Sequence, residues 1–176
     1  LNNLVLHQLH RGPDFNDTLI RNLNNDVNLG FSHTRLSLLD LTNLGNQPMV
    51  DTTSQNILVF NGEIYNYKEI KNELIQKGES FLSSSDSEVL LKGYRVFGLK
   101  SLVKKIRGMF SFVIWDHKRK IAILARDNLG IKPLYYSENE NYFSCASECS
   151  ALIKSKLVSK DICERGLDSF LAYGSL

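Results

Sequence analysis

Short polar turns join strand segments of this sequence into adjacent pairs, and this limits the fold more than any other feature. A mostly apolar run at 109–115 passes through a polar turn into a returning run at 121–126. Residues 133–136 and 142–145 form a second pair, joined by the polar segment 138–141. Strands connected by such short turns pair antiparallel. We therefore predict an α+β layer protein, and a doubly wound parallel sheet is disfavoured.

Two amphipathic helices are predicted before these hairpins. The first begins after Asn66, which is placed to cap it, and ends before Gly78. Its apolar face consists of Tyr67, Ile70 and Leu74. The second begins at 85–88, whose Ser-Asp-Ser-Glu sequence fits a capping box, and Gly98 ends it.

Two further strands are predicted nearer the N-terminus. Residues 31–38 alternate between apolar and polar side chains, which places Phe31, His33 and Arg35 on one face. Residues 57–60 form a short apolar strand that is expected to stop at the Asn-Gly pair that follows it. His33 is interpreted as a packing residue behind a site rather than as an acid or base.

Composition excludes several classes of protein. A length of 176 residues is close to one domain at ~150 residues per domain. With 21 basic and 19 acidic residues, the formal net charge of +2 argues against binding of nucleic acid or a membrane surface. The apolar runs are far shorter than the ~18 residues of a membrane span. Three cysteines disfavour a disulfide framework and favour a reducing compartment, so we expect a cytoplasmic protein.

Metal and phosphate sites are not predicted. Cys145 and Cys149 lack the paired spacing of a zinc site, and the four histidines show no ligand spacing. The segment 127–133 contains a glycine and a lysine without the spacing of a P-loop or a dinucleotide-binding turn. We expect neither a metal nor a cofactor in this part of the protein.

Polar residues on or after apolar strands are the remaining candidates for chemistry. Asn61 and Gly62 are expected just after a buried strand, where a side-chain amide and a backbone N–H can face a developing oxyanion. The planar guanidinium of Arg35 suits a carboxylate. Glu63 and Asp86 add two groups that bind cations. Together these types of residue would suit an amino-acid substrate.

Each of these residues also has a simpler interpretation. Asn61 and Gly62 are a common turn pair, and Arg35 is typical of a surface. Asp86 is favoured in the first turn of a helix by the helix dipole alone. The residues by themselves leave these alternatives open.

Eight short motifs are more specific, because they occur together in a fixed order. They lie at 10–14, 32–37, 47–49, 61–66, 85–88, 108–112, 125–136 and 146–148. In this order they resemble the glutaminase domain of glutamine-hydrolysing asparagine synthetases, within the class II glutamine amidotransferases. One motif would be a weak signal, but eight in register cover nearly the whole chain.

The resemblance implies a fold and a set of roles. The family is that of N-terminal-nucleophile hydrolases, a four-layer αββα sandwich with two antiparallel sheets. Arg35 would hold the α-carboxylate of glutamine, while Glu63 and Asp86 would hold its α-amino group. The side chain of Asn61 and the backbone N–H of Gly62 would form the oxyanion hole.

The resemblance also implies a nucleophile that these residues do not supply. In the family an N-terminal cysteine thiol attacks the side-chain amide of glutamine, its own α-amino group acts as the base, and ammonia leaves. The opening Cys-Gly-Ile segment of the family is absent here, and Cys145, Cys149 and Cys163 do not match its position. We therefore expect an N-terminally incomplete domain. The alternatives are an inert glutamine-binding or scaffold domain and an amidotransferase with a different acceptor.

We expect the glutaminase domain to occupy residues 1–155. Residues 156–176 resemble the lead-in to an ATP-dependent synthetase domain that would convert aspartate to asparagine. ATP and magnesium are accordingly implied for that absent domain and not for this one. The expected partners are glutamine and the synthetase domain, with a homodimer left open, and no nucleic acid or membrane is expected.

Overall fold

The centre of the fold is an antiparallel sheet that forms in the order β3-β4-β5-β6. The computed structural model describes residues 1–23, 27–37, 40, 42–156 and 158–174. The strands of this sheet are β3 (Met49–Val50), β4 (Ile57–Ile64), β5 (Gly108–Asp116) and β6 (Ile121–Arg126). Pairing of Ser111 with Asn61 on one side and Arg126 on the other makes β5 a central strand.

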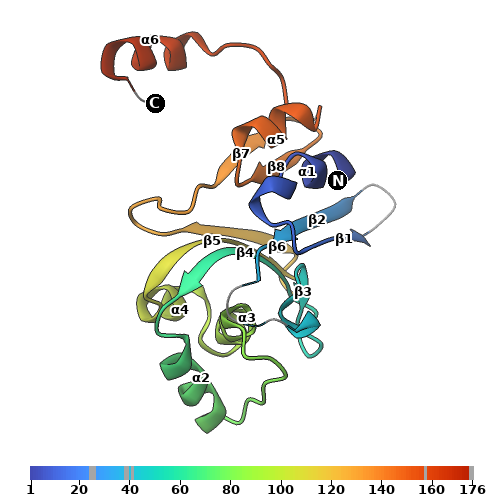
Figure 1. The fold of residues 1–176 in the computed structure, drawn as a ribbon, viewed down its shortest axis with the longest axis vertical. Helices are drawn as coiled ribbons and strands as arrows, with labels where there is room; N and C mark the ends of the chain where they lie inside the picture. The colour runs from blue at the N-terminus through green and yellow to red at the C-terminus, as the bar shows by residue number, and fades with distance from the viewer. Residues whose placement is uncertain (24–26, 38–39, 41, 157, 175–176) are drawn as a thin grey trace.

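Three helices cover one face of this sheet. They are α2 (Tyr67–Gln76), α3 (Asp86–Phe97) and α4 (Leu99–Lys105), and Figure 1 shows them together below the sheet. Alternate residues of β4 and β5 point into this layer because side chains alternate between the two faces of a strand. Leu58, Phe60 and Phe112 are among the buried residues that pack there against Leu90 of α3. This packing makes β4 a rigid support for the residues on its opposite face.

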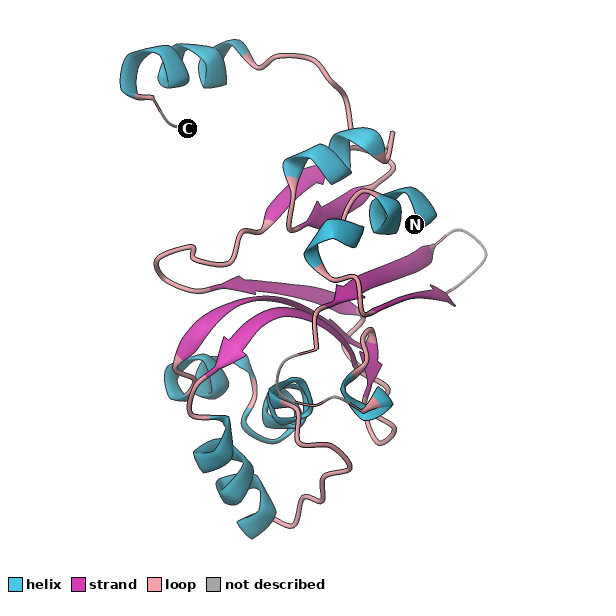
Figure 2. Cartoon of the chain, in the orientation of Figure 1, coloured by secondary structure: helices cyan, strands magenta, loops and turns pink. Residues whose placement is uncertain are grey.

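A second layer of strands lies on the opposite face of the sheet. It consists of two antiparallel pairs, β1 (Phe15–Asn22) with β2 (Asn28–Arg35), and β7 (Tyr135–Glu138) with β8 (Phe143–Ala146). The helices α1 (Asn2–Leu6) and α5 (Cys149–Lys154) contact each other beyond these strands, as Figures 1 and 2 show. The predicted α+β class with four layers is confirmed, although the described strands divide the second layer into two separate pairs.

The structure confirms the predicted hairpins and helices and corrects the predicted helix caps. Both predicted hairpins form, and the two predicted helices correspond to α2 and α3. The Asn66 side chain does not cap α2; it donates to the Lys105 carbonyl at 2.9 Å and accepts from the Arg107 N–H at 2.8 Å. At α3, Ser85 caps by accepting from the Ser87 N–H, but Glu88 does not complete the capping box. Its carboxylate instead accepts from the backbone before the helix.

The C-terminal segment contributes little to this core. The helix α6 (Glu164–Tyr173) has no buried residue, and Figure 1 shows it apart from the sheets. The boundary near residue 155 stays a prediction. Within the part of the chain that the structure describes, no helix combines the length and the apolar character needed to cross a membrane.

Candidate active site

The five residues predicted to form a site all line one cavity. It has a volume of about 620 Å³ and lies between the two strand layers, with walls from β2, β4, β5 and β8. Arg35, Asn61, Gly62, Glu63 and Asp86 are among its lining residues. Binding sites for small molecules typically occupy ~300–1,000 Å³. The cavity is therefore large enough for a free amino acid.

Asn61 supplies an unsatisfied amide donor to this cavity. The prediction that Asn61 and Gly62 follow the strand is wrong, because β4 continues to Ile64 and Asn61 pairs with Ser111. Alternation along β4 sends Leu58 and Phe60 into the helical core and turns Asn61 to the other face. Its Nδ2 atom is buried without a hydrogen-bond partner among the described residues. A buried donor without a partner costs ~1–3 kcal/mol, which a ligand oxygen would recover.

Gly62 directs its backbone N–H to the free edge of β4. On the same edge, the Phe60 N–H donates to Gln47 Oε1 at 2.6 Å and the Ile64 N–H donates to Asp86 Oδ2 at 3.0 Å. Because backbone groups alternate along a strand, the N–H of Gly62 points the same way as these two. A Cβ atom at Gly62 would lie 2.2 Å from the Met109 carbonyl oxygen, and its φ is +154°. Only glycine fits this position.

Asp86 brings a buried carboxylate to the same strand edge. It occupies the first turn of α3 and accepts from the backbone N–H of Ile64. Burial and, to a smaller extent, the nearby Glu63 charge raise the pKa of Asp86 to about 6, against the backbone hydrogen bonds that lower it. The pair of acids is therefore a place where an ammonium group would relieve an electrostatic cost.

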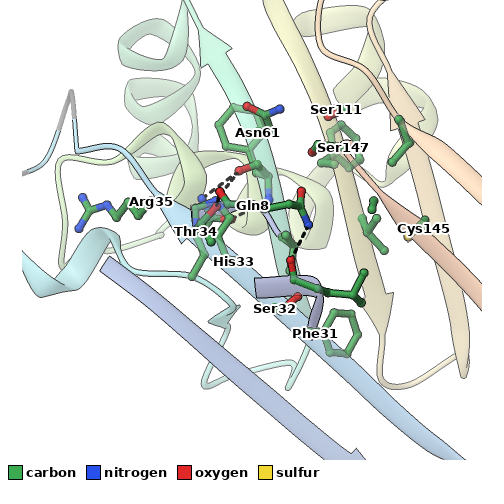
Figure 3. A pocket seen from close by; sticks show the side chains of 18 of the residues that line it. Gln8, Phe31, Ser32, His33, Thr34, Arg35, Asn61, Ser111, Cys145 and Ser147 are labelled. Atoms are coloured by element: carbon green, nitrogen blue, oxygen red, sulfur yellow. Dashed lines mark hydrogen bonds between the residues drawn. The ribbon is translucent and has the colours of Figure 1, made fainter. Parts of the chain in front are cut away.

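Arg35 lies at the end of β2 and reaches a different part of the cavity. Figure 3 shows its side chain extending away from Asn61. Its Nη1 donates to the Thr42 carbonyl at 2.8 Å and to Asn46 Oδ1 at 2.7 Å, and its Nη2 donates to the Asp40 carbonyl. The described residues thus accept three of the five N–H groups of the guanidinium. The structure brings all five predicted residues to one cavity, with Asp86 at the edge of β4 and the Arg35 guanidinium against Asp40, Thr42 and Asn46.

His33 and Gln47 also line the cavity. The sequence predicted His33 as a packing residue behind a site and gave no separate role to Gln47. His33 Nε2 lies 3.2 Å from the Phe60 carbonyl, and its Nδ1 is buried without a partner among the described residues. Burial lowers the pKa of His33 to about 4, so the ring is neutral at pH 7. The Gln47 side-chain amide pairs with the backbone of Phe60 as a neighbouring strand would. It accepts from the Phe60 N–H at 2.6 Å and donates to the Phe60 carbonyl at 3.2 Å. In the sequence, the predicted position of His33 on the same strand face as Arg35 was the signal that it lies near the site.

The cysteines of the chain do not provide a ready nucleophile. Cys145 lines the cavity from β8, and Figure 3 shows it on the other side of the cavity from Asn61. Burial raises the pKa of the Cys145 thiol to about 11, so it stays protonated at neutral pH. Cys149 and Cys163 are exposed.

Comparisons with known proteins identify relatives of this chain. The model of the family described as "Glutamine amidotransferase domain" matches residues 1–176. Asparagine synthetase [glutamine-hydrolyzing] 1 of Bacillus subtilis is 41% identical over 145 residues, which are 82% of this chain and 22% of that protein. Amidase chry2 of Gibberella zeae is 38% identical over 144 residues, covering 82% of this chain and 21% of that protein.

A solved structure supports the fold. The glutamine phosphoribosylpyrophosphate amidotransferase of B. subtilis, solved with ADP and GMP, has a TM-score of 0.70 at 20% identity. The similarity covers 88% of this chain and 40% of that one. This chain spans about a fifth of the length of the two relatives above. From its motifs, its layered strands and the family match along its whole length, the chain belongs to the glutamine amidotransferase domain family.

Proposed function

We propose that this site hydrolyses the side-chain amide of glutamine to give glutamate and ammonia. The observation that carries the proposal is the unsatisfied, buried Nδ2 of Asn61 in a cavity that Asp86 and Arg35 also line. A tetrahedral oxyanion would accept from Asn61 Nδ2 and from the Gly62 N–H. Preorganised donors of this kind stabilise charge that develops only in the transition state.

The two charged ends of the substrate have matching groups in the cavity. The α-ammonium group would lie beside Asp86 and Glu63. Asp86 supplies its negative charge above its pKa of about 6. The α-carboxylate would take the remaining N–H groups of Arg35. An arginine bound on one side to a loop is held in place, so less side-chain freedom is lost when a ligand binds.

The proposal includes a cysteine nucleophile from outside these 176 residues. Its thiol would give its proton to the α-amino group of the same cysteine and form a C–S bond to the amide carbon. The C–N bond would then break as the departing amide nitrogen takes up that proton and leaves as ammonia. Water would then cleave the thioester to release glutamate and restore the thiol. The protonated, buried Cys145 is a poor candidate for this step.

In the whole protein, we propose that the ammonia serves ATP- and magnesium-dependent conversion of aspartate to asparagine in the cytoplasm. The similarity to the B. subtilis synthetase supports this acceptor. The similarity to amidase chry2 favours a second candidate, in which the same glutaminase serves a different acceptor. If the full protein, supplied with glutamine, aspartate and ATP, releases ammonia but makes no asparagine, the second candidate is favoured.

Replacement of Asn61 by alanine tests the proposed chemistry. In the full protein, Asn61→Ala should lower kcat for glutamate release ~100- to 1,000-fold, because one oxyanion donor is lost. The KM for glutamine should change little. Asn56→Ala is the matched control, since Asn56 is buried beside the start of the same strand and accepts from the His117 N–H outside the cavity.

A glutamine-analogue electrophile, 6-diazo-5-oxo-norleucine, separates an active site from an inert one. Covalent labelling of one cysteine in the full protein, blocked by glutamine, supports the proposal. A protein that releases no glutamate and takes up no label is an inert binding domain, which contradicts it. Equal loss of glutamate release in the Asn61 and Asn56 variants would also contradict the role assigned to Asn61.

A further inference from the structure

A buried carboxylate joins the two charged ends of the cavity. Asp40 is only 5% exposed and lies between the end of β2 and the segment that precedes α3. Both of its carboxylate oxygens are hydrogen-bonded, and its backbone carbonyl accepts from Arg35 Nη2. Asp40 lines the cavity, although the sequence did not single it out.

One oxygen of Asp40 fixes the loop that holds Arg35. Oδ1 accepts from the backbone N–H of Thr42 at 2.8 Å and from its hydroxyl at 2.6 Å. The carbonyl of the same Thr42 accepts from Arg35 Nη1 at 2.8 Å. The Asp40 main chain and side chain thus act together on the guanidinium, directly and through one neighbour. Gly45 lies close against the guanidinium, since a Cβ there would lie 2.4 Å from Arg35 Nη2.

The other oxygen fixes the segment that presents Asp86. Oδ2 accepts from the Ser84 N–H at 2.9 Å and from the Ser84 hydroxyl at 3.1 Å. Ser84 directly precedes Ser85, the residue that caps α3 and therefore sets where Asp86 begins the helix. The hydrogen bonds from Thr42 and then Ser84 lower the pKa of Asp40 to about 2, against the effect of burial. The carboxylate is ionised throughout the neutral range.

We propose that Asp40 is a positioning residue that sets the separation between the carboxylate-binding Arg35 and the ammonium-binding Asp86. The inference rests on the proposed function and deepens it: the site would select substrates that carry both charged groups at the α-carbon. A ligand with both groups needs the correct separation, whereas a ligand with one group can settle against one end alone. In this proposal Asp40 contacts neither the α-carboxylate nor the α-ammonium group of the substrate. It acts through Arg35 and Asp86, which bind them.

Three amides of graded structure test this inference. Glutamine carries both groups, glutaramate lacks the α-ammonium group, and 4-aminobutanamide lacks the α-carboxylate, while all three keep the amide. Ammonia release by the full protein gives kcat and KM for each. Asp40→Asn should raise the KM for glutamine about 10- to 100-fold, because charge-assisted bonds to both segments are lost. It should raise the KM for each analogue less than about threefold and leave kcat for glutamine within about threefold.

Asp51→Asn is the matched control for loss of a buried carboxylate. Asp51 is also 5% exposed and accepts from a threonine two residues later, but it lies outside the cavity and pairs with Arg95. It should leave the preference among the three amides unchanged. If Asp40→Asn does not fold, Ser84→Ala removes one of the four bonds and should lower the same preference by a smaller factor.

The outcomes separate this inference from the proposed function. Equal loss for all three amides in the Asp40 variant would reduce Asp40 to a structural residue and overturn the inference. An unchanged glutamine KM would overturn it as well. A wild-type protein that releases ammonia from none of the amides would overturn the proposed function first, and this inference with it.

Discussion

Replacing Asp86 with asparagine should make this protein more stable at neutral pH while weakening its binding of glutamine. Asp86 is buried, and its charge is opposed by burial and by Glu63. Asparagine has nearly the same shape and can still accept from the Ile64 N–H through its side-chain oxygen. The charged group, and with it the cost of holding that charge in the folded protein, is removed.

The size and sign of the effect follow from the pKa of Asp86. Folding raises this pKa from 3.8 to about 6, a shift of about 2 pH units. At ~1.36 kcal/mol per unit, ionised Asp86 costs the folded state about 3 kcal/mol at most. The folded state binds the Asp86 proton more tightly, so the contribution of Asp86 to wild-type stability falls as pH rises from about 4 to about 6. Above pH 6 the full cost remains, and below pH 4 it disappears.

Urea unfolding of wild type and Asp86→Asn at pH 4, 5, 6 and 7.5 measures this directly. The single tryptophan, Trp115, is 5% exposed and reports unfolding by its fluorescence. The variant should gain up to about 3 kcal/mol in unfolding free energy at pH 7.5 and almost nothing at pH 4. Equal or lower stability of the variant at pH 7.5 would refute the reasoning.

A second carboxylate provides a control of opposite sign. Asp116 is buried, which raises its pKa, but hydrogen bonds from the Tyr94 hydroxyl at 2.6 Å and from the Arg119 N–H outweigh burial and lower it. Ionised Asp116 therefore contributes stability above its unfolded pKa. Asp116→Asn should lower stability at pH 7.5, whereas Asp86→Asn should raise it.

Three further predictions concern the cavity. Arg35→Ala in the full protein should raise the KM for glutamine ~10- to 100-fold, because the carboxylate contact is lost together with the bonds to Asp40, Thr42 and Asn46. Any reaction driven by free ammonia should be spared, because it needs no glutamine; steady-state kinetics with both nitrogen sources check this, and equal loss of both activities would count against the assignment. Gly62→Ala should abolish glutamate release, since the new Cβ would lie 2.2 Å from the Met109 carbonyl, and an active variant would show that this edge of β4 is not part of the site. Cys145→Ser should keep glutamate release within about threefold, as expected for a thiol whose pKa is about 11; complete loss would make Cys145 the nucleophile.

The sequence predicted the hairpins well because alternating and apolar runs carry a direct signal. The β5–β6 pair and the β7–β8 pair both lie close to the predicted ranges. By contrast β1 was not predicted, since its residues are mostly polar and exposed. Its pairing with β2 is a tertiary effect that local sequence does not reveal. The helix α4 was also missed, because it is short and follows directly on Gly98.

The site shows where local signals mislead. Asn61 and Gly62 were predicted to end a strand, since an Asn-Gly pair usually marks a turn. They instead continue β4, where they pair with Ser111 and Phe110. Asn61 thereby buries an amide donor that has no partner among the described residues, and this cost in stability is not predicted by local sequence preference. The roles assigned to the five site residues came from the resemblance and stay predictions. The resemblance did not extend to Asp40, whose partners become visible only when the loops meet.

A structure of the full protein with glutamine bound, its nucleophile replaced, tests the central claim most directly. The account predicts that the side-chain carbonyl oxygen lies about 3 Å from both Asn61 Nδ2 and the Gly62 nitrogen. It also predicts the α-ammonium group beside Asp86 and the α-carboxylate on Arg35. A glutamine bound outside this cavity, or with its amide turned away from Asn61, would contradict the account.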